Sequence, residues 1–101
     1  MSKAYWIARV DVTDPEAYEA YRTANAAALA KYGARFIVRG GAHEVKEGAS
    51  RARNVVIEFK DYATAVACYE SPEYQAAKSH RTTASVGDLI IIEGYDGPQP
   101  S

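Results

Sequence analysis

The residues best placed to do chemistry in this chain are four charged side chains set among apolar neighbours: Arg9, Arg39, Glu58 and Glu93. Each stands in a stretch rich in β-branched or aromatic residues, so we expect each to lie in a strand. An isolated buried ion is costly, and such charges must therefore pair or bind something. An arginine fork could grip the carboxylate of a small acidic or polar ligand. The competing interpretation, which we favour slightly, is a structural ion-pair network at a subunit interface.

A second polar group falls on one face of a predicted helix. Tyr18, Tyr21 and Asn25 recur at spacings of three and four, which places them on a single stripe. A buried Asn25 amide must find hydrogen-bond partners, either in a ligand or in the sheet and the tyrosine hydroxyls. We predict a small pocket between this helix and the sheet, with the ligand-binding residues Tyr18, Tyr21, Asn25, Arg39 and Glu58.

Other reactive side chains give weaker signals. His80 could serve as a base or as a metal or haem ligand, but neither it nor His43 has neighbours at metal-ligand spacing, and we expect no metal. Cys68 is expected to be a small buried hydrophobe. Trp6 is expected in the core, although a cavity lined by Trp6, Asn25 and tyrosines would suit an aromatic or polyketide-like substrate. The sequence has no phosphate loop or dinucleotide fingerprint, and we expect no cofactor.

The elements that must position these side chains follow from local patterns. Asp14-Pro15 and Ser71-Pro72 each supply a capping side chain followed by a proline at the first helical position. Three helices are expected, at residues 15–32, 61–70 and 72–81. Four strands are expected, at residues 5–12, 35–46, 51–60 and 89–95.

The order strand, helix, strand, strand, helix, strand predicts the ferredoxin-like βαββαβ arrangement. This is an α+β fold with an antiparallel sheet and its helices on one face. Right-handed crossovers predict the strand order fourth, first, third, second. Gly48-Ala49 is expected to be a two-residue hairpin loop, which places Arg39 opposite Glu58 unless a bulge at Gly40-Gly41 shifts the register.

Alternation along the strands sorts the side chains onto two faces. The helix-facing set is expected to hold Trp6, Ala8, Val10, Phe36, Val38, Val55, Ile57, Phe59, Ile90 and Ile92. The other face then carries, in strand order, Glu93, Arg9, Glu58 and Arg39, which alternate in sign and can pair across each ladder. Such a face is too apolar for solvent and suits packing against a second copy of the chain.

Several stretches of the chain resemble the domain-of-unknown-function 1330 family of dimeric α/β barrel proteins. They are Tyr5-Trp6-Ile7, Asp14-Pro15-Glu16, Tyr18 with Tyr21 and Asn25, Arg35-Phe36-Ile37-Val38-Arg39-Gly40-Gly41, Val56-Ile57-Glu58-Phe59, Ser71-Pro72-Glu73-Tyr74 and Gly87-Asp88. The resemblance covers residues 4–94 and implies a homodimer whose two sheets face each other to form a barrel. It implies no established reaction, and the wider superfamily is similar in fold to cofactor-independent oxygenases, small-ring isomerases, haem-handling enzymes and proteins without known catalysis.

Composition bounds the remaining possibilities. A chain of 101 residues, 48% hydrophobic and 25% charged, is typical of one globular domain, expected at residues 1–95 with a flexible tail at 96–101. The net charge of −1 and the scattered charges argue against nucleic acid or an anionic membrane as partners. The single cysteine and the lack of a signal-like N-terminus favour a cytoplasmic address.

The sequence therefore predicts a cytoplasmic homodimer that binds a small molecule in a polar pocket between the sheet and the first helix. One alternative is a cofactor-independent oxygenase or isomerase that acts on a small aromatic or a lactone. A second alternative is a structural or interaction dimer that binds no ligand.

Overall fold

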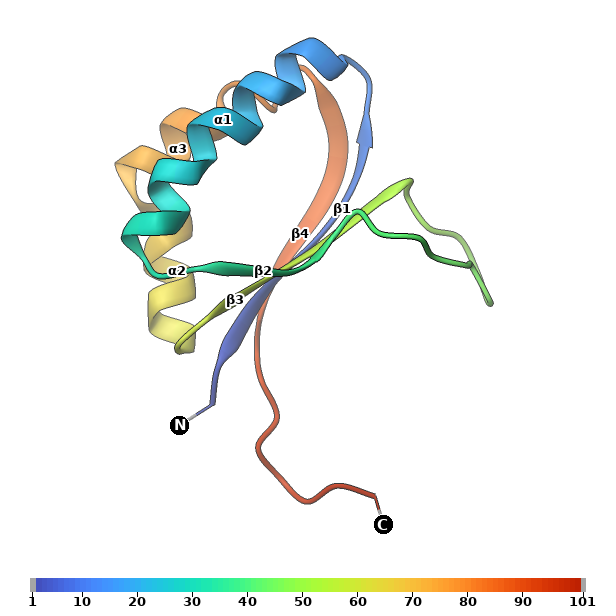
Figure 1. Cartoon of the computed structure of the whole chain (residues 1–101), viewed down its shortest axis with the longest axis vertical. Helices are drawn as coiled ribbons and strands as arrows, with labels where there is room; N and C mark the ends of the chain where they lie inside the picture. The colour runs from blue at the N-terminus through green and yellow to red at the C-terminus, as the bar shows by residue number, and fades with distance from the viewer. Residues whose placement is uncertain (1, 101) are drawn as a thin grey trace.

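A four-stranded antiparallel sheet carries three helices on one face, as the computed structural model of residues 2–100 shows (Figure 1). The chain runs through β1 (Ala4–Val12), α1 (Pro15–Lys31), β2 (Arg35–Arg39), β3 (Arg53–Phe59), α2 (Tyr62–Glu70), α3 (Pro72–Lys78) and β4 (Ser85–Glu93). The strands lie in the order β2-β3-β1-β4. The α+β, ferredoxin-like fold is confirmed, and the order is the one that right-handed crossovers predict. Met1 and Ser101, at the outer ends of the predicted domain and tail, lie outside the described residues.

The predicted caps account for where the helices begin. Asp14 accepts a hydrogen bond from the Ala17 amide at 3.2 Å, and Pro15 takes the first helical position. Ser71 ends α2 and begins α3, because its hydroxyl accepts from the Tyr74 amide at 3.1 Å while it donates to the Cys68 carbonyl at 2.7 Å. The second helical region is thus split in two, as the repeated cap-proline signature predicts.

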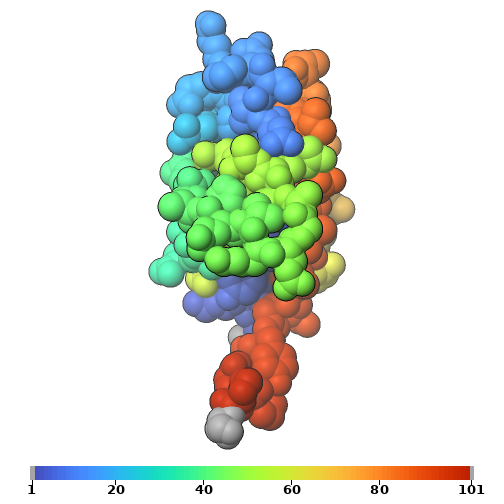
Figure 2. All heavy atoms as spheres, turned by 90° about the vertical axis from the view of Figure 1, so that its right-hand side faces the viewer, coloured from blue at the N-terminus to red at the C-terminus, as the bar shows by residue number. Residues whose placement is uncertain are grey.

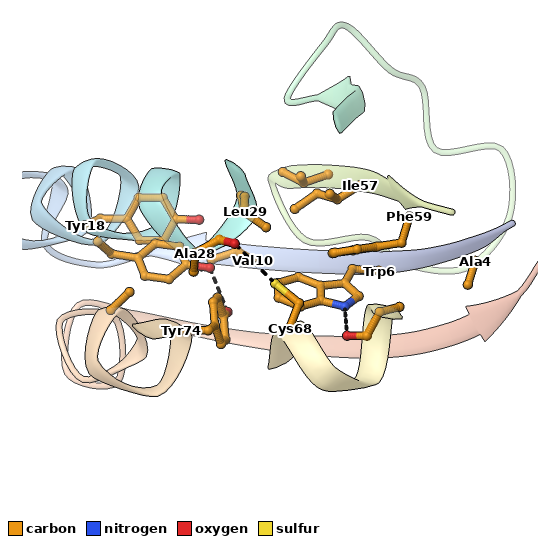
Figure 3. Packing of buried hydrophobic residues seen from close by; sticks show 14 of the residues in the cluster. Ala4, Trp6, Val10, Tyr18, Ala28, Leu29, Ile57, Phe59, Cys68 and Tyr74 are labelled. Atoms are coloured by element: carbon orange, nitrogen blue, oxygen red, sulfur yellow. Dashed lines mark hydrogen bonds between the residues drawn. The ribbon is translucent and has the colours of Figure 1, made fainter. Parts of the chain in front are cut away.

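The core is built around Trp6, which packs between the sheet and the helices (Figure 3). Its ring lies 5.0 Å from the Phe59 ring and 4.8 Å from the Tyr74 ring, measured between centroids. Its indole N–H donates to the Ala65 carbonyl at 3.0 Å, so the buried polar atom is satisfied and β1 is tied to α2.

The connection between β2 and β3 differs from the predicted tight hairpin. β2 ends at Arg39 and β3 begins at Arg53, and residues 40–52 form an arm that projects away from the helices (Figure 1; green, in front, in Figure 2). At its base, Arg51 donates to Asp11 and to Asp88, each at 2.9 Å. These ion pairs, together with the left-handed turn at Gly40 (φ 69°), take the chain out of the sheet where pairing was expected to continue.

The predicted register of this strand pair is wrong. Arg35, and not Arg39, lies opposite Glu58, and Arg39 lies opposite Val55. The register shifts between Phe36 and Val38, so a bulge inside β2 turns the following side chains to the other face. Arg39 therefore lies on the helix-facing side of the sheet.

The predicted faces of β4 are also inverted. Ile91 pairs beside Trp6, and it packs against the core together with Leu89. Ile90 and Ile92, expected in the core, lie on the opposite face and are 53% and 46% exposed. The predicted charged face therefore does not form as a set of four. Among them, Arg9 and Glu58 share the open face, while Arg39 and Glu93 lie on the helix side by their register.

The helices are short and mixed in polarity. Among residues 2–100, none is long and apolar enough to cross a membrane.

Candidate functional site

A hollow lies between α1 and the sheet, and we call it the α1 pocket. Its cavity volume is about 40 Å³, and the surrounding space that opens to solvent brings the total to about 540 Å³. Its walls combine aromatic and aliphatic side chains with a few polar ones. The lining residues are Trp6, Ala8, Val10, Tyr18, Tyr21, Arg22, Asn25, Phe36, Arg39, Arg53, Val55, Ile57, Arg81, Asp88 and Leu89.

Two regular elements, α1 and β1, place seven of these fifteen side chains. On α1, Tyr18, Tyr21 and Asn25 occupy successive turns of one stripe and are buried against the sheet. On β1, alternate residues from Trp6 to Val10 point to the same side. The predicted pocket between the first helix and the sheet thus has a counterpart in the structure, built on rigid elements.

Asn25 is the most deeply placed polar side chain of this wall. It is only 6% exposed and lines the α1 pocket. Buried amides nearly always have partners, since an unmade hydrogen bond costs about 1–3 kcal/mol. The Asn25 amide can therefore offer both a donor and an acceptor to whatever occupies the pocket.

A short hydrogen-bond chain links two residues of the pocket lining, Tyr21 and Arg81, through Tyr74. The hydroxyls of Tyr21 and Tyr74 lie 2.8 Å apart, and Arg81 donates to the Tyr74 hydroxyl at 3.4 Å. Burial raises the pKa of Tyr74, and the neighbouring Tyr21 raises it further. Burial likewise raises the pKa of Tyr18, with Tyr21 adding to the effect. These phenols therefore stay protonated near neutral pH and can orient a ligand without acting as bases.

Four arginines reach the pocket: Arg22, Arg39, Arg53 and Arg81. Three of them lie near aromatic rings. The guanidinium carbon of Arg39 is 4.0 Å from the centre of the Phe36 ring, that of Arg81 is 5.3 Å from the Tyr21 ring, and that of Arg53 is 6.0 Å from the Tyr18 ring. Of these arginines, the sequence analysis singled out Arg39 alone. The sequence did hold a signal for two of the others. Arg22 follows Tyr18 by four residues and so shares its helix face, and Arg53 alternates with Val55 and Ile57 and so shares their strand face.

The structure brings together four of the five predicted ligand-binding residues. Tyr18, Tyr21, Asn25 and Arg39 all line the α1 pocket. Glu58 does not, because it lies on the opposite face of the sheet, where it accepts from Lys3 at 3.2 Å and lies 3.5 Å from Arg35. Arg39 and Glu58 therefore cannot act as the pair that the predicted register suggested.

The remaining reactive side chains lie elsewhere. His80 is exposed in the turn after α3, and His43 is exposed in the arm. Cys68 is fully buried, and burial together with the charge of Glu73 raises the pKa of its thiol to about 11. Within residues 2–100, no group of three or more His, Cys, Asp or Glu side chains could hold a metal ion.

Comparison with known families gives one match. The model of the family described as domain of unknown function (DUF1330) matches residues 3–95. No curated protein matches the chain.

Several solved structures share the fold. RPA0582, a protein of unknown function from Rhodopseudomonas palustris, is 20% identical with a TM-score of 0.74, over 95% of this chain and 85% of its own. SnoaB, a cofactor-independent oxygenase from Streptomyces nogalater, is 14% identical with a TM-score of 0.64, over 99% and 97%. A dimeric ferredoxin-like protein of unknown function from Thermobifida fusca is 17% identical with a TM-score of 0.56, over 91% of both chains. Similarity at this level shows the fold alone.

Proposed function

We propose that this chain, which belongs to the family described as domain of unknown function DUF1330, is a homodimer that binds a small organic molecule in the α1 pocket. The observation that carries the proposal is the Asn25 side chain, which is only 6% exposed and lies at the wall of the α1 pocket. A side chain in that position costs stability unless something completes its hydrogen bonds. A ligand seated between α1 and the sheet would do so.

The open face of the sheet supports the dimer. It presents Val38, Val86, Ile90 and Ile92, all exposed, with half-buried Ile7 among them. Contiguous apolar surface of this kind marks an interaction site in most proteins. A second copy of the same face is the simplest cover, because a two-fold axis makes one patch serve both subunits. The Thermobifida fusca neighbour is described as dimeric. The free, buried Cys68 is compatible with the cytoplasm as the place of action.

A second candidate is a cofactor-independent oxygenase acting on an aromatic substrate. The observation in its favour is the composition of the pocket, in which Trp6, Tyr18 and Tyr21 line the same hollow as Asn25. SnoaB, whose fold is similar, is described as such an enzyme. Binding remains the better-supported proposal, because Asn25 explains recognition without requiring turnover. The structural-dimer alternative gives the α1 pocket no role.

Native mass spectrometry of freshly purified protein tests the proposal. We expect a dimer that carries a small molecule, and we expect Asn25→Ala to lose most of that molecule while keeping its circular dichroism spectrum. The matched control is Thr23→Ala, on the exposed side of the same helix. Equal retention by both variants, or a ligand-free wild-type protein that also binds nothing from a panel of small aromatics, would reject the proposal. Oxygen consumption with a bound aromatic would favour the oxygenase.

A further inference from the structure

We infer that the α1 pocket selects an organic anion, specifically a small aromatic carboxylate. This inference rests on the proposed binding function and goes beyond it, because it names the class of ligand. Its basis is the set of arginines at the pocket, Arg22, Arg39, Arg53 and Arg81, three of which were not foreseen from the sequence.

The first observation is the balance of charge. The lining residues include four arginines and one acidic residue, Asp88, whose position opposite Arg9 turns its carboxylate toward the open face. The Asp88 carboxylate is already held by Arg51 at 2.9 Å. Arg22 lies 3.1 Å from Glu19, an exposed pair that contributes little. The field inside the pocket is therefore positive and favours an anion.

The second observation concerns hydrogen bonds. The Nε atoms of Arg22, Arg53 and Arg81 are buried, and none has a partner among residues 2–100. A guanidinium presents Nε–H and Nη–H side by side, a fork that matches the two oxygens of a carboxylate. A buried donor attached to a charge is costly when unmet. A carboxylate entering the pocket would meet both this hydrogen-bond deficit and the charge excess.

The third observation is the close approach of the backbone at Gly40 to the Arg53 side chain. A Cβ atom at Gly40 would lie 2.7 Å from the Arg53 Nη1 atom, and Gly40 adopts a positive φ of 69°. The glycine thus lets the backbone approach the guanidinium closely. Arg53 belongs to β3 and lies opposite Val10, on the helix side of the sheet. Its head group is placed at the pocket by a rigid strand.

The body of the ligand follows from the apolar walls. Trp6, Phe36 and Tyr18 line the same hollow, and a flat ring can stack on or meet the edges of such side chains. Inorganic phosphate would pair with the arginines but would leave these apolar walls in contact with water. An aromatic carboxylate satisfies both the arginines and the walls.

The test uses matched probes on the full chain, with Trp6 fluorescence and isothermal titration calorimetry as readouts, since Trp6 is the only tryptophan. The probes are benzoate and 2-naphthoate, their neutral amides, and the corresponding methylamines. We expect each carboxylate to bind about tenfold or more tightly than its amide, and the amine to bind most weakly. Arg53→Met should remove most of this preference.

The control variant is Lys60→Met, because Lys60 is an exposed cation that directly follows β3 and does not line the α1 pocket. It should keep the wild-type preference. Amides that bind as tightly as the carboxylates would overturn the anion inference and leave the binding function standing. If none of the six probes binds at millimolar concentration, both the inference and the proposed function fail. If Arg53→Met fails to fold, the affinities of the wild-type protein for carboxylate and amide are compared at high salt instead. Loss of the carboxylate preference there supports the anion inference, because salt screens charge recognition and leaves apolar contacts intact.

Discussion

The Tyr74 hydroxyl is a fully buried polar group shared by two elements. It lies 2.8 Å from the hydroxyl of Tyr21 on α1 and 3.4 Å from the Nη2 atom of Arg81, so one oxygen ties α3 to α1 and to the turn that follows α3. Because burial keeps the phenol protonated, this link does not depend on pH near neutrality. It also sets the position of Tyr21, which forms part of the pocket wall.

Tyr74→Phe should lower the free energy of unfolding by about 1–3 kcal/mol, because it leaves the buried Tyr21 hydroxyl without its partner. Urea denaturation followed by circular dichroism measures this loss. Tyr62→Phe is the control, since that ring is 46% exposed. It should change stability by less than about 0.5 kcal/mol. Equal effects of the two substitutions would show that the hydroxyl pair contributes nothing.

At the scale of elements, the junction of α2 and α3 depends on one side chain. Ser71 is buried and serves as the last cap of one helix and the first cap of the next. Ser71→Ala should cost about 0.5–2 kcal/mol in thermal or chemical denaturation, because the Tyr74 amide loses its capping oxygen. Ser79→Ala removes an exposed hydroxyl that donates to the Ala76 carbonyl, and it should be nearly neutral. If Ser71→Ala left the stability unchanged, Pro72 alone would account for the break between α2 and α3.

The elements also show what a single sequence can and cannot reveal. Capping residues and helical spacing predicted α1 and the buried stripe of Tyr18 and Asn25, because both signals are local. The orientation of β4 could not be predicted, since the run Leu89 to Ile92 is apolar throughout and has no polar residue to mark its outer face. The strand partner of Arg39 was predicted wrongly because a bulge within β2 shifts the pairing. No distinctive residue in the sequence marks the position of that bulge.

The pocket illustrates the same limit. Tyr18, Tyr21 and Asn25 could be grouped because one helix carries them. Arg22, Arg53 and Arg81 come from three segments far apart in the chain, and their convergence depends on the packing of α1 across the sheet. A charged residue is also assumed to face solvent unless a partner is in view. The convergence of these arginines therefore could not be predicted, because it depends on contacts between residues far apart in the sequence.

At the scale of the whole molecule, the proposed dimer depends on the open sheet face. We expect sedimentation velocity to show a wild-type dimer and to show Ile92→Glu shifted toward monomer. An unpaired carboxylate trapped in the interface costs about 3–5 kcal/mol, enough to weaken association more than a hundredfold. Tyr62→Glu is the matched control, because Tyr62 is also 46% exposed but lies on α2, across the sheet from this face. A monomeric wild type, or a dimeric Ile92→Glu, would contradict the proposed interface.

The arm also bears on how the molecule could be extended. Its two ends are fixed to the sheet, because the Gly40 amide donates to the Asn54 carbonyl at 2.9 Å and the Ala52 amide donates to Asp11 at 2.9 Å. Residues 41–49 between these anchors are exposed. Doubling the length of a flexible loop costs only about 0.6 kcal/mol of closure entropy. Foreign sequence, such as an epitope tag or a grafted recognition peptide, could therefore be accommodated here while the strands on either side keep their pairing.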